Sequence, residues 1–289
     1  MIIPNTIDFT WQELAISNLN ALLPVRDQLH YSVQFIAAAG KYLIEPRPDD
    51  SHTSVSWHQP SSSFMGQPIL NKHNYFISLK PEILELSICD DKKIPIKSIS
   101  LHQNSRTSIL SWMRSSLSEI GIESKNLWLE MHYEIPDHPL AHGEDFELIN
   151  TEYFDFFSKI YSNADNIFST IKNLIPETSE IRCWPHHFDI ATLISLDPNK
   201  DAEQARSIGI GMSPGDAEFA SPYFYITPWP YPDKSIKLPD ISGPGGWHTK
   251  SWSGRLLDLS ELLEAANQKE IVERFMIEGL RACMELLKK

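Results

Sequence analysis

The stretch that decides the fold is Leu84-Glu85-Leu86-Ser87-Ile88-Cys89-Asp90-Asp91-Lys92-Lys93-Ile94. Its apolar residues at Leu84, Leu86 and Ile88 alternate with polar residues, which predicts a strand with one buried face. Four charged residues follow, and aspartates of this kind favour a turn. The apolar pattern then resumes over residues 94–101. We therefore predict an antiparallel hairpin.

The same patterns predict further elements on both sides of this hairpin. Alternating or β-branched runs predict strands at residues 53–58, 75–79, 127–134, 180–184, 188–196, 207–212, 223–227 and 247–257. Helical spacing predicts a short helix capped by Thr10 and longer helices over residues 24–43, 105–120, 151–175 and 269–287. The strands and helices do not alternate regularly, as a doubly wound parallel sheet would require. We predict an α+β fold of mostly antiparallel sheet packed with two or three long helices.

The chain length permits one large domain. The 289 residues are expected to form a single compact unit, 1–289. Two packed halves, about 1–148 and 149–289, are the alternative because each contains strands and one long helix.

Charge and cysteine content narrow the partners and the compartment. The chain has 38 acidic and 25 basic residues, so neither nucleic acid nor a membrane is expected as a partner. Cys89, Cys183 and Cys283 are widely spaced and match no disulfide framework or zinc motif. The first residues lack the features of a signal peptide, so a cytoplasmic location is expected. The cofactor, the oligomeric state and any catalytic residue stay open.

The densest unusual motif is Cys183-Trp184-Pro185-His186-His187-Phe188-Asp189. If it enters a strand, His187 and Asp189 share one face and His186 lies on the other. A carboxylate beside an imidazole can hold its tautomer and raise its basicity, which suits a general base or a metal ligand. A buried structural His–Asp pair is the alternative that the following apolar residues favour.

Two later segments are candidate ligand contacts. Ser213-Pro214-Gly215-Asp216 predicts a type II turn, which is favoured over the alternative that the glycines beside it let a ligand approach the backbone. In residues 222–232, Tyr223, Tyr225 and Trp229 could wall a pocket, or the segment could be an edge strand on the core. Residues 132–145 hold histidines and acids, for which a solvated acidic loop is favoured over a metal site.

Three motifs together resemble a known family. They are Trp-Pro-His-His-Phe-Asp at 184–189, Gly-Met-Ser-Pro-Gly-Asp at 211–216 and Pro-Tyr-Phe-Tyr-Ile-Thr-Pro-Trp-Pro at 222–230. They resemble an uncharacterised, mainly bacterial family that is catalogued as a domain of unknown function, and the likeness covers most of the chain. The resemblance implies a soluble cytoplasmic protein in which these motifs meet around one site, and it carries over no catalytic residue.

Three functional hypotheses follow. The preferred one is a soluble small-molecule-binding protein, or an enzyme of unidentified class. Its ligand-binding residues would be His187, Asp189, Asp216, Tyr223, Tyr225 and Trp229. The second is a metal-dependent hydrolase that uses His186 or His187 with Asp189 and needs at least three ligands at one point. The third is a protein-interaction module without catalytic activity, with an exposed proline–aromatic surface.

Overall fold

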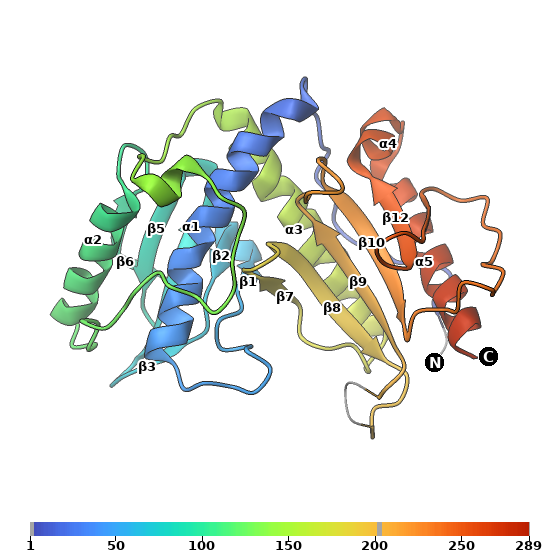
Figure 1. The fold of residues 1–289 in the computed structure, drawn as a ribbon, viewed down its shortest axis with the longest axis horizontal. Coiled ribbons are helices and arrows are strands. Elements are labelled where there is room, and N and C mark those ends of the chain that lie inside the picture. The colour runs from blue at the N-terminus through green and yellow to red at the C-terminus, as the bar shows by residue number, and fades with distance from the viewer. Residues whose placement is uncertain (1–2, 201–203, 289) are drawn as a thin grey trace. The chain divides into compact units, whose positions relative to one another are not determined.

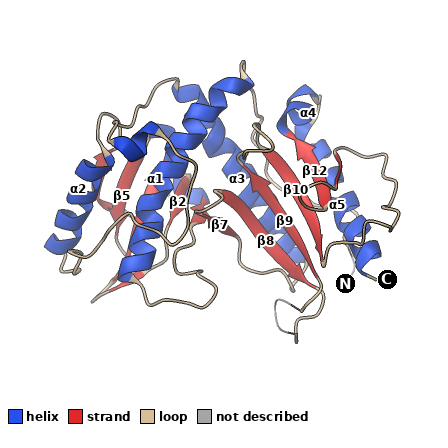
Figure 2. Ribbon diagram, in the orientation of Figure 1, coloured by secondary structure: helices blue, strands red, loops and turns tan. Residues whose placement is uncertain are grey.

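The computed structural model describes residues 3–200 and 204–288, and the chain divides into two compact units. Unit 1 comprises Met1–Ser17, Asn163–Ile181 and Asp189–Lys289, and unit 2 comprises Asn18–Ser162 and Arg182–Phe188. The division falls inside helix α3 (Thr151–Leu174), whereas the two predicted halves meet near residue 148. Helices and two antiparallel sheets are present, which confirms the α+β fold (Figures 1 and 2).

Unit 2 contains a sheet in the order β1-β2-β4-β5-β6, with β3 paired to β4. Its strands are β1 (Ser56–His58), β2 (Ser63–Met65), β3 (Ile69–Leu70), β4 (Asn74–Lys80), β5 (Glu85–Cys89) and β6 (Pro95–Ser100). The predicted hairpin is confirmed as β5–β6, with Leu86 opposite Ile99. Asp90 forms its turn by accepting hydrogen bonds from the backbone amides of Lys92 and Ile94.

Two complete helices pack in unit 2. Helix α1 (Leu22–Leu43) contacts β4 and β3 along an almost continuous run of buried residues (Figure 1). Near its end a Cβ on Gly40 would lie 2.3 Å from the backbone oxygen of His52, so this close packing needs glycine. Helix α2 (Arg106–Glu119) begins at the cap Ser105, and the positive φ of Gly121 follows its end.

Short elements complete unit 2. They are the 3₁₀ helices η1 (Leu19–Ala21), η2 (Gln59–Ser61), η3 (Pro81–Ile83) and η4 (Pro139–His142), and strand β7 (Arg182–Trp184). In β7, Cys183 exchanges two backbone hydrogen bonds with Val55, of 2.6 and 3.0 Å. This bridge holds residues 182–188 beside the chain that leads into β1.

Unit 1 contains the strand order β11-β12-β10-β9-β8, all antiparallel. The strands are β8 (Asp189–Ser195), β9 (Ser207–Ser213), β10 (Tyr223–Trp229), β11 (Gly246–His248) and β12 (Gly254–Asp258). Two helices follow, α4 (Leu259–Glu264) and α5 (Gln268–Leu287). The predicted single strand over residues 247–257 is wrong, because β11 and β12 are separate strands that pair with each other.

The two faces of the unit 1 sheet differ. Phe224 and Ile226 of β10 are buried on one face, where Gly279 of α5 packs on Ile226 and Phe168 of α3 meets Phe224 edge-on. Alternation along β10 places Tyr223 and Tyr225 on the opposite face. The apolar face therefore forms the core of unit 1, and the other face carries the candidate ligand contacts.

The helix predicted after Thr10 is wrong. Residues 6–16 contain no helix. The backbone amide of Gln12 donates to the Asn163 side chain at 2.8 Å, and that of Leu14 donates to the Gln268 side chain at 2.9 Å. These side-chain amides take the backbone groups that a helix would have paired.

The strand predicted over residues 127–134 is also wrong, because side chains replace a partner strand. The guanidinium of Arg114 donates to the backbone oxygen of Leu127 at 2.8 Å. Lys41 and Tyr42 both donate to the backbone oxygen of Glu130, at 2.7 and 3.1 Å. The segment therefore keeps its backbone bonded without joining a sheet.

Among the helices of the described residues, none combines the length and apolar character needed to cross a membrane.

Candidate functional site

The segment after Trp184 is a turn, and this overturns the expected strand geometry. The backbone amides of His187 and Phe188 both donate to the backbone oxygen of Trp184, at 3.2 and 2.7 Å. Phe188 has a φ of 59°, which no strand residue adopts, and β8 begins only at Asp189. The prediction that His187 and Asp189 share a strand face is therefore wrong.

Helix α1 anchors this turn within unit 2. His30 Nε2 lies 2.8 Å from the backbone oxygen of Pro185, and the Gln34 side-chain amide donates to the same oxygen at 2.8 Å. The His30 ring stacks on Phe188 with centroids 5.4 Å apart. The hydroxyl of Tyr161 donates to the backbone oxygen of Phe188. The position of Trp184 and His186 is thus set by buried contacts.

A cavity of about 250 Å³ lies beside the turn, entirely within unit 2. We call it the Trp184 cavity; its lining residues are Asp49, Asp50, Thr53, His132, Tyr133, Trp184 and His186. They come from three segments that are distant in the sequence. His132 Nε2 lies 3.3 Å from Asp50 Oδ2, and the His186 ring lies 5.5 Å from that of Tyr133 and 6.2 Å from that of Trp184.

Three of the lining groups have shifted pKa values. Hydrogen bonds from Ser51 lower the pKa of Asp49, so this carboxylate stays ionised at neutral pH. Burial, reinforced by His187 and His132, lowers the pKa of His186, which is therefore mainly neutral at pH 7. Burial raises the pKa of Tyr133, which keeps its proton. The cavity thus combines carboxylates with a neutral imidazole and a phenol.

Gln34 connects two walls of the Trp184 cavity. It is 3% exposed, and its Oε1 accepts a 2.8 Å hydrogen bond from the hydroxyl of Tyr133. Its Nε2 donates to the backbone oxygens of Pro185 and His30, at 2.8 and 3.0 Å. Sequence analysis missed this residue. Its position lies off the apolar stripe that contains Leu29, Val33 and Ile36, so the helical pattern did not indicate that its amide is buried.

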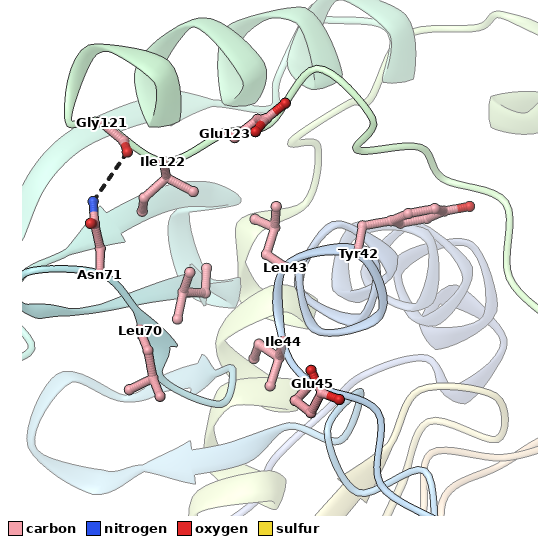
Figure 3. Close-up of a pocket in the computed structure, with 10 residues that line it drawn as sticks. Tyr42, Leu43, Ile44, Glu45, Leu70, Asn71, Gly121, Ile122 and Glu123 are labelled. Atoms are coloured by element: carbon pink, nitrogen blue, oxygen red, sulfur yellow. Dashed lines mark hydrogen bonds between the residues drawn. The ribbon is translucent and has the colours of Figure 1, made fainter.

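A second cavity of about 440 Å³ lies at the end of α1 in unit 2 (Figure 3). Its lining residues are Tyr42, Leu43, Ile44, Glu45, Ile69, Leu70, Asn71, Gly121, Ile122 and Glu123. Leu43 and Ile44 face Leu70 and Ile122 across it, and Asn71 donates to the backbone oxygen of Gly121 at 3.2 Å. It is more open than the Trp184 cavity, and no imidazole or indole is among the described residues that line it.

Four of the six predicted ligand-binding residues come together in unit 1, as two tyrosine–aspartate pairs. The hydroxyl of Tyr225 donates to Asp189 Oδ2 at 2.5 Å, and that of Tyr223 donates to Asp216 Oδ2 at 2.7 Å. The two tyrosine rings lie 6.1 Å apart. Burial, followed by the neighbouring aspartates, raises the pKa of both tyrosines, so both remain hydrogen-bond donors.

Gly211 makes the first pair possible. Gly211 on β9 lies between Ala191 on β8 and Tyr225 on β10. A Cβ at Gly211 would lie 2.2 Å from Tyr225 Cζ, so the ring crosses the strand directly above this glycine. The space beside Gly211, where the sequence allowed a ligand to approach the backbone, is therefore filled by the Tyr225 ring.

The second pair is closed by its own loop. Gly215 has a φ of 101°, as the predicted type II turn requires. Asp216 Oδ1 accepts hydrogen bonds from the backbone amides of Glu218 and Phe219, at 2.7 and 2.8 Å, while Oδ2 takes the Tyr223 hydroxyl. Asp216 is thus bonded on both oxygens within unit 1.

The two remaining predicted residues lie elsewhere. Trp229 is at the end of β10 and is 45% exposed, with its ring 5.6 Å from that of Tyr231. Tyr231 is also 45% exposed, as an interaction surface would require. His187 is exposed and belongs to unit 2.

A further polar group in unit 1 resembles a catalytic triad in composition. His248 Nε2 lies 3.1 Å from Ser251 Oγ and 3.6 Å from Glu218 Oε1, and Ser251 donates to Glu218 at 2.5 Å. A nucleophilic triad needs the serine and the acid on opposite nitrogens of the imidazole. Here both approach the same nitrogen, so the arrangement does not activate Ser251.

The metal hypothesis needs three ligands at one point. Within residues 3–200 and 204–288, no group of three or more His, Cys, Asp or Glu side chains is arranged to hold a metal ion. His186 and His187 are neighbours, with ring centroids 4.4 Å apart, but two imidazoles do not meet the requirement.

Comparison of the chain with family models, curated proteins and solved structures found no match. The family resemblance therefore stays a prediction, and any functional conclusion has to come from the geometry of the two units.

Proposed function

We propose that the protein binds a small organic molecule in the Trp184 cavity. The observation that carries the proposal is the convergence of carboxylates, imidazoles, a phenol and an indole from three segments on a space of about 250 Å³. Small-molecule sites typically combine such rings with a few placed polar groups. The preferred function from the sequence is retained, while its location moves from the tyrosines of β10 to this cavity.

The rigidity of the walls supports this proposal. Trp184 is held on one side by the Cys183–Val55 bridge, and the next carbonyl, that of Pro185, is held by His30 and Gln34. Tyr133 is held by Gln34 on the opposite wall. Walls that are already ordered lose little side-chain entropy on binding, which favours affinity.

The polar groups of the cavity also support recognition. His186 is neutral at pH 7 because its pKa is lowered, so it can donate or accept one hydrogen bond. Asp50 is half exposed beside His132, and Asp49 is mainly exposed, so a ligand could reach either carboxylate. These groups can orient a ligand while the rings of Tyr133 and Trp184 provide contact area.

The test uses two buried glutamines of α1 that perform matched tasks. Gln34 links Pro185 to Tyr133, whereas Gln28 links to both backbone groups of Glu147, at 2.9 and 2.7 Å, away from the cavity. Each substitution removes side-chain hydrogen bonds that typically contribute about 0.5–1.5 kcal/mol each. Gln34→Leu and Gln28→Leu should therefore destabilise the protein similarly.

Ligand binding should separate the two variants. A library of small organic fragments is screened against the wild-type protein by ligand-observed NMR, and the best binder is titrated into each variant. Gln34→Leu is expected to weaken its affinity roughly tenfold, equivalent to about 1.4 kcal/mol, because Tyr133 loses the hydrogen bond that holds it, while Gln28→Leu leaves it unchanged. The proposal fails if both variants bind the fragment equally well, or if no fragment binds.

A further inference from the structure

We propose that the ligand of the Trp184 cavity is a small organic cation, of the alkylated or quaternary ammonium class. This inference rests on the proposed function and specifies the chemistry of its ligand. It follows from the charge of the lining residues, from the orientation of the rings and from the absence of a metal-ligand set among the described residues.

The first argument is the charge of the lining. Asp49 and Asp50 are acidic, and none of the seven described lining residues is lysine or arginine. Two arginines next to these segments bind serine hydroxyls: Arg182 donates to Ser54 Oγ at 3.0 Å, and Arg47 donates to Ser51 Oγ at 3.4 Å. The pKa of Asp49 is lowered more by its hydrogen bonds from Ser51 than by the charge of Arg182. The cavity therefore favours a positive ligand.

The second argument is the set of aromatic walls. The Trp184 and His186 rings are inclined by 61°, and the Tyr133 and His186 rings by 52°. Inclined rings form a corner that can present several faces to one ligand. The negative faces of tryptophan and tyrosine attract alkylammonium groups, an interaction used in many quaternary ammonium sites.

The third argument separates an organic cation from a metal ion. Calcium takes six to eight oxygen ligands, and magnesium requires near-octahedral coordination. Two exposed aspartates cannot provide such a shell, and the described residues form no group of three metal ligands. A bulky organic cation needs no such shell, because it binds through ring faces and longer-range attraction to the carboxylates.

The experiment compares three probes of nearly identical shape. Choline carries a positive charge, 3,3-dimethylbutan-1-ol is neutral, and 3,3-dimethylbutyrate is negative. Each is titrated into the full chain while the indole N–H signal of Trp184 is followed by NMR. We expect choline to bind roughly tenfold more tightly than the neutral probe, because its positive charge is attracted to the ring faces and to the carboxylates. The anion should bind most weakly.

Two variants of lining residues and a matched control test whether the preference for choline depends on Asp50 and on Trp184. Asp50→Asn should reduce choline affinity several-fold and leave the neutral probe unaffected, because only the charge is removed. Trp184→Leu should weaken the binding of both choline and the neutral probe. Because this variant lacks the Trp184 indole, binding is followed through the NMR signals of the probe. The control is Asp137→Asn, since Asp137 forms a comparable exposed pair with His142 at 2.8 Å but does not line the cavity.

The outcomes distinguish this inference from the proposed function. Choline preference that is lost in Asp50→Asn but kept in Asp137→Asn supports a cationic ligand. Equal or tighter binding of the neutral or anionic probe overturns the cation and leaves small-molecule binding intact. If no probe moves Trp184, the cation is also overturned, while the fragment screen separately decides whether the cavity binds any organic molecule.

Discussion

The Trp184 cavity of unit 2 and the tyrosine–aspartate pairs of unit 1 are built from the same kinds of residue. Both join carboxylates and aromatic rings from distant segments. In unit 1 each aspartate accepts a hydrogen bond from a tyrosine of the same unit. In unit 2 the acids and rings surround a space of about 250 Å³. Residue type alone therefore does not identify a binding site. The distinguishing feature is the unfilled space beside the polar groups.

Local packing explains this difference. In unit 1, Gly211 lacks a side chain, and the Tyr225 ring fills the space above it to reach Asp189. In unit 2, Gln34 and His30 hold the turn at Pro185, while Gln34 also holds Tyr133. In unit 1, the absence of a side chain at Gly211 lets the Tyr225 ring reach Asp189. In unit 2, the buried side chains of Gln34 and His30 hold two walls of the cavity in place.

The largest predicted effect is a loss of stability at acidic pH that is caused by His30. Burial lowers its pKa from 6.5 to about 4, so between these values the unfolded chain binds a proton that folded His30 does not. The free energy of unfolding therefore falls as the pH falls from 7 to 4, by about 3 kcal/mol from this group. His30→Gln keeps a hydrogen-bond donor toward Pro185 but cannot be protonated. Between pH 7 and pH 4, the free energy of unfolding of this variant should therefore fall by about 3 kcal/mol less than that of the wild type.

Urea unfolding at pH 7, 5.5 and 4 measures this difference in the wild type and in the variant. Because His30 anchors the turn that carries Trp184, the result also tests whether unit 2 depends on a neutral buried imidazole. Identical acid dependence in the two proteins would show that His30 does not have this role.

A smaller effect is expected from Gly211→Ala in unit 1. The new Cβ would meet the Tyr225 ring at 2.2 Å, and forced overpacking of this kind costs about 1–3 kcal/mol. Gly246→Ala is the control, because a Cβ there meets no atom within 4 Å and should change stability by less than about 0.5 kcal/mol. Urea unfolding compares the two variants, and equal stabilities would contradict the described position of Tyr225.

The sequence predicted the elements in which burial follows a regular period. The alternation at Leu84, Leu86 and Ile88 marks the buried face of β5, and the apolar spacing of α1 and α3 identifies both segments as helices. It failed at Thr10 and over residues 127–134, where side chains such as Asn163 and Lys41 bind the backbone. Those partners are far away in the chain, so no local pattern reveals them.

The residues of the candidate site were predicted only in part, because some of its contacts depend on tertiary structure. Strand alternation, a local property, places Tyr223 and Tyr225 on one face of β10, whereas the contact of Tyr225 with Asp189 depends on the pairing of β8, β9 and β10. The turn at Phe188, with its rare positive φ, separated His187 from the strand register of Asp189. Gln34 could not be assigned to a cavity wall without the tertiary positions of Pro185 and Tyr133.

The central claim is that the open site is in unit 2 and that the polar contacts of unit 1 are closed. The indole N–H signals of Trp184 and of Trp252, whose ring lies 6.3 Å from that of Tyr225, report on the two places. They can be assigned with Trp184→Phe and Trp252→Phe and followed while pools of organic fragments are added. We expect fragments to shift the Trp184 signal and to leave the Trp252 signal in place. Fragments that shift Trp252 and leave Trp184 unchanged would contradict it.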